Sequence, residues 1–345
     1  MSDFKKLTAL SKAAILGSLI ACSPQRFENI PLNPMIQGPI LENSKTTDTF
    51  VQDNGGNKVD ILIINDNSPS MYEEQTKLGE RFKSFISGIK DLDYQIAMTT
   101  TDVDSKEFGL QGSLMTWKGT GSIVLTPSTS NPEQAFLETV QRSETLNCNF
   151  DTGEGCASSN EQPLLQLIQS FGKRFSTNAG FFREGAPLVV VVLSDEDEMS
   201  TGVIGATPAS AVINAFELAF GREKRLMFTG IVIKPEDTKC QEEQRRQSKG
   251  NGQGNFATRV AELAKLTRAE LISICEKDYA QPLSEMSRLV RTLVTTFELR
   301  KEPRGGKASV KFTPALDIGY KLKGKKIVFD VPPPVGTIIE VSYDE

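Results

Sequence analysis

Three oxygen-bearing side chains follow one short apolar run at alternate positions. The run 61–64, all Ile or Leu, leads through Asn65 to Asp66, and Ser68 and Ser70 come next. An apolar run of this length, bounded by turn residues, is typical of a buried strand that ends in a polar loop. Ligands of open α/β sheets bind at the carboxyl ends of the strands. A carboxylate and two hydroxyls there supply part of the near-octahedral oxygen shell that Mg²⁺ requires.

A second acid follows the end of a second apolar strand. The run 187–193 is the most apolar strand in the chain, and it ends in Ser194 followed by Asp195. A continuous β-branched run of this kind suits a central parallel strand that is covered on both faces. If the two apolar strands are neighbours, Asp195 lies near Asp66. Two strands that each end in an acid are a more specific signal than either one alone.

The elements that must position these acids form a regular alternation. The expected strands are 59–64, 94–100, 187–193, 226–233 and 270–274, with a hairpin or edge strand at 116–126, and the expected helices are 71–90, 133–142, 162–175, 208–220, 255–266 and 282–299. This order predicts an α/β domain over residues 58–300, with a doubly wound, mostly parallel sheet and helices on both faces. The polar stretch 234–255 is expected to be a mobile loop. Residues 301–345 are expected to form a small β appendage.

The motif Asp66-x-Ser68-x-Ser70 resembles the metal-site motif of von Willebrand factor A (vWA) domains, and the likeness extends over about residues 58–298. In that family the motif binds a divalent cation, usually Mg²⁺, together with a Thr from a second loop and an Asp that ends a later strand. The resemblance implies that Asp66, Ser68, Ser70 and Asp195 are metal ligands. Glu196 stands where the family usually has Gly, and the added negative charge favours Ca²⁺. Mg²⁺ is the expected cofactor, with Ca²⁺ or Mn²⁺ as alternatives.

The second loop departs from the family pattern because it has no Thr at the expected place, just before the helix at 162–175. Ser158 is the expected substitute ligand, and Ser159 or the Glu161 carboxylate are alternatives. A plainer explanation also exists for the serines. Ser70 and Ser158 each begin a Ser-x-x-Glu sequence, which fits a helix capping box. Asp197 and Glu198 are expected to be solvated loop charges rather than ligands.

Residues 1–22 look like a secretion signal, with Lys5 and Lys6 before a short apolar core. The core is too short to span a bilayer as a helix. The signal ends in a sequence, 19–22, that resembles the lipobox of bacterial lipoproteins, which implies that Cys22 is the lipidated N-terminus. The alternatives are an unlipidated signal peptide or a chance apolar helix. Ser23 favours the outer membrane of a Gram-negative bacterium by the habit of that family. Residues 23–57 are expected to be a flexible tether.

Four cysteines remain after Cys22, and an even number in an exported protein suggests two disulfides with three possible pairings. We favour Cys148–Cys156 and Cys240–Cys275. The alternative is four buried thiols.

The composition excludes several functions. The chain has no histidine, so Ser-His-Asp and Cys-His catalytic systems and His-based zinc sites cannot be built. The formal charge of −5 argues against nucleic acid as the main partner. Phosphotransferases of the haloacid dehalogenase type need a second Asp where this chain has Ser68. The chain is therefore not expected to be an enzyme.

The expected function is that of a cell-envelope lipoprotein that binds a partner protein. In vWA domains the metal bridges the domain and an acidic side chain of its ligand, and this mode is the first expectation here. The alternative is a structural lipoprotein that acts as an envelope scaffold, with a degenerate and metal-free site. The missing Thr and the replaced Gly favour that alternative.

Overall fold

The computed structural model describes residues 45–52, 56–149, 151–199, 205–222, 224–247 and 254–345. The expected signal peptide 1–22, with Cys22, lies outside the described residues, and so does the expected tether up to residue 44. Within the described ranges, none of the helices combines the length and the apolar character that crossing a bilayer needs.

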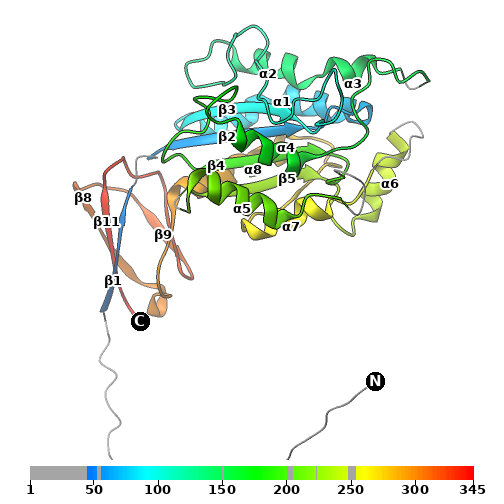
Figure 1. The fold of residues 1–345 in the computed structure, drawn as a ribbon. Coiled ribbons are helices and arrows are strands. Elements are labelled where there is room, and N and C mark those ends of the chain that lie inside the picture. The colour runs from blue at the N-terminus through cyan, green and yellow to red at the C-terminus, as the bar shows by residue number, and fades with distance from the viewer. Residues whose placement is uncertain (1–44, 53–55, 150, 200–204, 223, 248–253) are drawn as a thin grey trace, which may run out of the picture. The chain divides into compact units, whose positions relative to one another are not determined.

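A parallel sheet forms the centre of the main domain (Figure 1). Its strands are β2 (Lys58–Asn65), β3 (Asp93–Thr100), β4 (Leu188–Ser194), β5 (Leu226–Val232) and β6 (Ile272–Ser273). They are hydrogen-bonded in the order β3-β2-β4-β5-β6, and every neighbouring pair is parallel. The chain moves from β2 to β3 on one side and later enters β4 on the other side of β2. The strand order therefore reverses between β2 and β4, which is where doubly wound folds bind ligands.

Helices cover both faces of this sheet. They are α1 (Tyr72–Ile89), α2 (Pro132–Val140), α3 (Ser143–Asn147), α4 (Pro163–Gly172), α5 (Ala209–Phe220), α6 (Thr238–Gln247), α7 (Thr258–Leu266) and α8 (Ala280–Thr295), with a short 3₁₀ turn η1 (Pro69–Met71) before α1. Successive strand residues point to opposite faces. Ile61 and Ile63 therefore share a core with α1, α2 and α8, whereas Leu62 and Ile64 share one with α4, α5 and α7. The predicted doubly wound, mostly parallel fold is confirmed.

Antiparallel strands build a second, smaller β structure. Its strands are β1 (Lys45–Val51), β7 (Thr296–Glu298), β8 (Ala308–Thr313), β9 (Tyr320–Lys323), β10 (Lys326–Phe329) and β11 (Ile338–Asp344), with a 3₁₀ turn η2 (Arg304–Gly306). They form one sheet of order β1-β11-β8 and another of order β7-β10-β9. Phe312 and Val341 of the first sheet and Phe329 of the second belong to one buried apolar cluster. We call this two-sheet structure the β-sandwich.

The expected tether is wrong for residues 45–51, because these residues form β1 and pair with β11 over their whole length. The β-sandwich thus combines β1 with residues 296–344 rather than consisting of 301–345 alone. The sequence did not indicate this strand because the buried residue at its centre is an acid, Asp48, and not an apolar residue. An alternating apolar pattern was therefore absent from the sequence.

Two further expectations differ from the structure. The stretch 116–126 contains a single antiparallel bridge, Ile96 to Leu125, and no regular strand. Trp117 fills the core there, and its ring N–H donates to the carbonyls of Ile96 and Ile123. The stretch 234–255 was expected to be a loop, but it contains α6. This helix is held by a disulfide and by the buried side chain of Gln244.

Replacing Asp48 with Asn is expected to lower the free energy of unfolding by about 1–3 kcal/mol near neutral pH. Asp48 is 4% exposed and forms an ion pair with Arg300, whose backbone N–H also donates to Oδ2 at 2.9 Å. The Tyr343 hydroxyl donates to the same oxygen at 2.6 Å. Burial acts to raise the pKa of Asp48, but the hydrogen bonds from Tyr343 and Arg300 outweigh it and hold that pKa below its ordinary value.

A lowered pKa stabilises the fold above the unfolded-state pKa, and this stabilisation is lost as the pH falls through the folded-state pKa. The difference between Asp48→Asn and wild type should thus be present at pH 7 and shrink in acid. Urea unfolding of the full chain at several pH values measures it, with the exposed Asp317→Asn as the matched control. A difference that stayed constant with pH would contradict the assignment.

Candidate metal centre

The carboxyl ends of β2 and β4 bring the two strand-terminal acids together. The strands pair in parallel with Asn65 opposite Leu193, and the Asp66 N–H donates to the Leu193 carbonyl at 2.9 Å. Asp66 and Asp195 are both fully buried. The strand pairing that the apolar runs suggested therefore places both acids at the edge where the strand order reverses.

A chain of hydrogen bonds links the first loop to the second acid. The Ser68 N–H donates to Asp66 Oδ1 at 2.8 Å, and the hydroxyls of Ser68 and Ser70 lie 2.9 Å apart. Ser70 Oγ donates to Asp195 Oδ1 at 3.1 Å, and Ser194 Oγ donates to Asp66 Oδ2 at 2.6 Å. Asp66, Ser68, Ser70 and Asp195 are thus neighbours in space, and their role as metal ligands stays a prediction.

The capping-box explanation of the serines does not hold. The N-cap of α1 is Met71 and that of α4 is Gln162, and neither makes a side-chain capping bond. Ser70 directs its hydroxyl to Asp195 instead of the helix backbone. The plainer explanation for Ser70 is therefore excluded in this structure.

The second loop contributes Glu161 rather than Ser158 to this edge. Ser158 Oγ accepts the Asn160 N–H at 3.1 Å, and the Ser158 N–H donates to Asp102, so its hydroxyl serves the loop's own turn. Glu161 is 1% exposed, and its side chain contacts the Glu196 carboxyl. The hydrogen bonds of Ser158 therefore give no support to its expected role as a metal ligand. Glu161 is the second-loop residue whose side chain is buried at this edge.

The acidic run after β4 is buried except for the half-buried Asp197, and its members have different partners. Asp195 and Glu196 belong to the candidate metal centre, whereas Asp197 accepts the backbone N–H groups of Arg259 and Val260. Glu198, which is 3% exposed, accepts the Leu164 N–H at 2.7 Å. These carboxylates therefore cap the N-termini of α7 and α4, where the helix dipole favours negative charge. The expectation that Glu198 is a solvated charge is wrong, whereas Asp197 is half-buried and bonded to the backbone of α7.

Burial and mutual repulsion raise the pKa values of the carboxyl groups at this edge. Burial is the largest cause for Asp66, and with the charge of Glu196 it raises the pKa from 3.8 to about 6, against the hydrogen bonds from Ser194 and Ser68. Burial, followed by the charges of Asp66 and Glu196, holds the pKa of Asp195 well above its ordinary value. Burial and the Glu196 carboxyl do the same to the pKa of Glu161.

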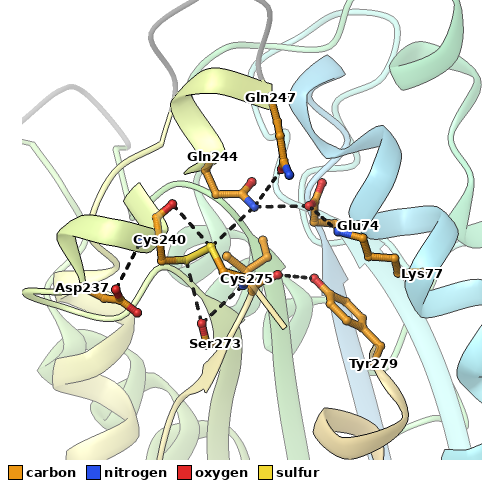
Figure 2. Close-up of a disulfide and its surroundings, with 10 residues drawn as sticks. Glu74, Lys77, Asp237, Cys240, Gln244, Gln247, Ser273, Cys275 and Tyr279 are labelled. Carbon is orange, nitrogen blue, oxygen red and sulfur yellow. Dashed lines mark hydrogen bonds and ion pairs between the residues drawn. A yellow bond between two sulfur atoms is a disulfide. The ribbon is translucent and has the colours of Figure 1, made fainter. Parts of the chain in front are cut away.

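A further buried carboxylate, Glu74 on α1, adds to the negative potential at Asp195. Its Oε1 accepts from Lys77 Nζ at 3.4 Å and from Gln244 Nε2 at 3.3 Å. Figure 2 shows Gln244 reaching from α6 toward Glu74, beside the disulfide that joins Cys240 to Cys275. Both predicted disulfides, Cys148–Cys156 and Cys240–Cys275, are present. The second one fixes α6 against this flank of the candidate metal centre.

The donors at this edge fit a hard divalent cation. They are carboxylate and hydroxyl oxygens, which Mg²⁺ and Ca²⁺ prefer. Among the described side chains, Asp195 Oδ2 and both carboxylate oxygens of Glu161 are buried without a hydrogen-bond donor. Such oxygens are costly to bury unless a proton or a cation compensates them. The described residues nevertheless contain no group of three acidic or cysteine side chains arranged to hold an ion by themselves. A cation therefore needs the serine hydroxyls as well.

Sequence reasoning missed two residues of this edge as site members. Ser194 was seen only as a strand end, and Glu196 only as a departure from the family pattern. Their positions directly before and after Asp195 were the available signal. Once β4 is placed beside β2, the Ser194 hydroxyl donates to the Asp66 carboxyl, and the charge of Glu196 acts on the same carboxyl.

No protein-family model matches the chain, and no curated protein matches it. The chain is similar in structure to the pilus adhesin SpaC of Lactobacillus rhamnosus GG, with a TM-score of 0.37, 10% identity and coverage of 87% of this chain and 40% of the adhesin. It is also similar to proximal thread matrix protein 1 of the mussel byssus with a zinc-occupied MIDAS motif (TM-score 0.37, 12% identity, coverage of 71% of this chain and 50% of that one).

A third similar structure is the manganese-loaded TRAP protein of Plasmodium vivax, with a TM-score of 0.33, 12% identity and coverage of 70% of this chain and 77% of that one. The chain spans half or less of the length of the adhesin and the mussel protein. Likeness at this level assigns neither function nor ligand to this chain.

Proposed function

We propose that this protein binds a partner protein through a divalent cation held at the carboxyl ends of β2 and β4, in the manner of a vWA domain. The supporting observation is the hydrogen-bonded set Asp66, Ser68, Ser70 and Asp195, which lies at the strand-order reversal and includes one buried carboxylate oxygen without a donor, Asp195 Oδ2. When bound, the cation supplies an open coordination position for an oxygen ligand. Asp66 and Asp195 supply its counter-charge, and Ser70 orients Asp195.

The proposed ligand of the cation is an acidic side chain of the partner, as the vWA resemblance implies. The proposed location is the cell envelope, with a lipid anchor at Cys22 in the outer membrane, and it rests on the lipobox-like sequence alone. We further propose that the protein is not an enzyme, because the chain has no histidine base and has Ser68 where phosphotransferases of the haloacid dehalogenase type need a second Asp.

The alternative function is that of an envelope scaffold with a metal-free site. Two observations favour it. In the described ranges no three acidic side chains are arranged to hold an ion, and Glu161 and Glu196 add negative charge that opposes a partner's carboxylate. One proton shared between Glu161 and Glu196 would lower the negative charge of this pair. A partner's carboxylate could then still approach the cation, as the metal-dependent function requires.

Titration of Mg²⁺, Mn²⁺ and Ca²⁺ into the chelator-treated full chain distinguishes the two functions. Binding of about one ion per chain, with a dissociation constant of about 10⁻⁵–10⁻³ M, is expected for the metal-dependent function. Peptides selected for binding in Mg²⁺ should then contain an acidic residue and dissociate in chelator. The absence of calorimetric binding by all three ions would exclude the metal-dependent function and favour the scaffold alternative, and peptides that stay bound in chelator would exclude the bridging role of the metal.

A further inference from the structure

Glu161 is held in place by the backbone on both sides. It forms an antiparallel bridge with Asp102, which follows β3, and the next residue, Gln162, donates its N–H to the Thr101 carbonyl at 3.0 Å. The Glu161 carbonyl accepts the Met199 N–H at 2.8 Å. These bonds tie the residue between the end of β3 and the loop after β4. The carboxylate is therefore positioned by the sheet rather than by a free loop.

The Glu161 side chain has no donor to satisfy it. It is 1% exposed, and neither carboxylate oxygen accepts a hydrogen bond from any described residue. Its polar contact is the Glu196 carboxyl, which is also an acceptor when ionised, and Asp66 lies close enough for its charge to act on Glu161. Two ionised carboxylates in contact repel each other unless a proton or a cation lies between them.

We propose that Glu161 is a specificity-determining residue of the candidate metal centre and makes it favour Ca²⁺ over Mg²⁺. This inference rests on the proposed function, because it needs a cation at the Asp66 edge. It goes beyond the vWA resemblance, in which a neutral Thr hydroxyl contributes from the second loop. A buried carboxylate in that place changes both the charge and the number of oxygens available to the ion.

Coordination chemistry gives the direction of the effect. A hydroxyl offers one neutral oxygen, whereas a carboxylate offers two oxygens that share a negative charge. Ca²⁺ takes six to eight oxygens in flexible geometry, and its affinity rises with the number of charged ligands. Mg²⁺ demands a smaller octahedral shell and keeps several waters. An additional carboxylate at a crowded, acidic edge therefore stabilises Ca²⁺ more than Mg²⁺.

The test compares calcium and magnesium chloride titrations of the full chain, wild type and Glu161→Gln, by calorimetry. We expect the wild-type protein to bind Ca²⁺ at least about tenfold more tightly than Mg²⁺. Glu161→Gln keeps the shape of the side chain and removes its charge, and it should lower the ratio of Ca²⁺ to Mg²⁺ affinity by about tenfold or more. Glu161→Thr, which introduces the hydroxyl of the vWA pattern, should also lower the ratio of Ca²⁺ to Mg²⁺ affinity.

Ser158→Ala is the matched control, because the Ser158 hydroxyl accepts only its own loop's N–H in this structure. It should leave both affinities within about twofold of wild type. If both ions bind and Glu161→Gln leaves their ratio unchanged, the role of Glu161 is wrong while the metal site stands. If Ser158→Ala changes the ratio and Glu161→Gln does not, Ser158 is the second-loop ligand. If neither ion binds to wild type, the role of Glu161 and the proposed function both fail.

Discussion

Replacing Asp66 with Asn is expected to abolish divalent-cation binding and, in the same protein, to stabilise the cation-free fold. The loss of the only first-loop carboxylate should lower the cation affinity by on the order of 100-fold or more. Asn has the same shape, so its amide oxygen can still accept the Ser68 N–H, and the Ser194 hydroxyl can rotate to accept from its NH₂ group. The side chain remains packed while its charge is removed.

The stabilisation follows from the pKa of Asp66, which burial raises from 3.8 to about 6 in the cation-free fold. A carboxyl whose pKa is higher in the folded state contributes stability below the unfolded-state pKa, and this contribution is lost as the pH rises through the folded-state pKa. The cation-free wild-type protein should therefore lose roughly 3 kcal/mol of stability between pH 4 and pH 7 from this group. Asp66→Asn should lack this loss.

Two measurements on the full chain test both parts. Calorimetric titration gives cation binding, and urea unfolding in chelator at several pH values gives the stability. Asp197→Asn is the matched control, because Asp197 belongs to the same acidic run but caps α7, so it should bind the cation as wild type does. The assignment of Asp66 fails if the Asn variant binds the ion normally. It also fails if the stability of Asp66→Asn relative to wild type, both in chelator, does not rise between pH 4 and pH 7.

Replacing Arg183 with Met is expected to destabilise the protein by about 3–5 kcal/mol, because it leaves a buried carboxylate without its main partner. Asp60, at the start of β2, is fully buried. The Arg183 guanidinium donates to Asp60 Oδ1 at 2.7 Å and to Asp93 Oδ1 at 2.7 Å, and the Arg183 N–H donates to Asp60 Oδ2 at 2.8 Å. Lys224 Nζ, 3.5 Å from Asp60, remains in the variant and limits the loss.

The pH dependence of this variant has a definite sign. Burial raises the pKa of Asp60 even in the wild-type protein, against the charges of Lys224 and Arg183. Without Arg183 the pKa should rise further, so the stability of Arg183→Met should increase as the pH is lowered from 7 toward that pKa. Adding Asp60→Asn to the variant should recover part of the loss at pH 7, because the buried carboxylate charge that Lys224 compensates only in part is then gone.

Urea unfolding of the full chain measures these effects. The control is Arg222→Met, because Arg222 pairs with Glu217 while its side chain is 84% exposed, and its loss should change the stability by no more than about 0.5 kcal/mol. A destabilisation by Arg183→Met as small as that of the control would show that Lys224 alone suffices for Asp60.

Several features of the fold follow from local sequence. The buried runs of β2 and β4 consist of apolar residues that point to both faces, and this pattern predicts central strands, whereas their pairing with each other is seen only in the structure. Asp66 and Asp195 come directly after these runs, so their proximity followed once the strands were taken as neighbours. The first-loop serines lie within four residues of Asp66, and their placement needed only the local chain. The cysteine count and spacing led to both disulfides.

Long-range contacts decided the rest. β1 shows no alternating apolar pattern, because its inward-facing Asp48 is stabilised by Arg300 and Tyr343 from distant parts of the chain. Glu161 enters the candidate metal centre because its backbone pairs with Asp102 and its side chain meets Glu196.

The acidic run 195–198 illustrates the difference between the two levels. Its four consecutive acids look equivalent in the sequence, and the positions of β2, α4 and α7 give them separate partners. The sequence alone determined which strands are central and which acid ends each of them, because these depend on the pattern of neighbouring residues, and it favoured the cysteine pairing that the structure then established. Only the tertiary structure decided which buried acids face one another, because that depends on where separate elements place their ends.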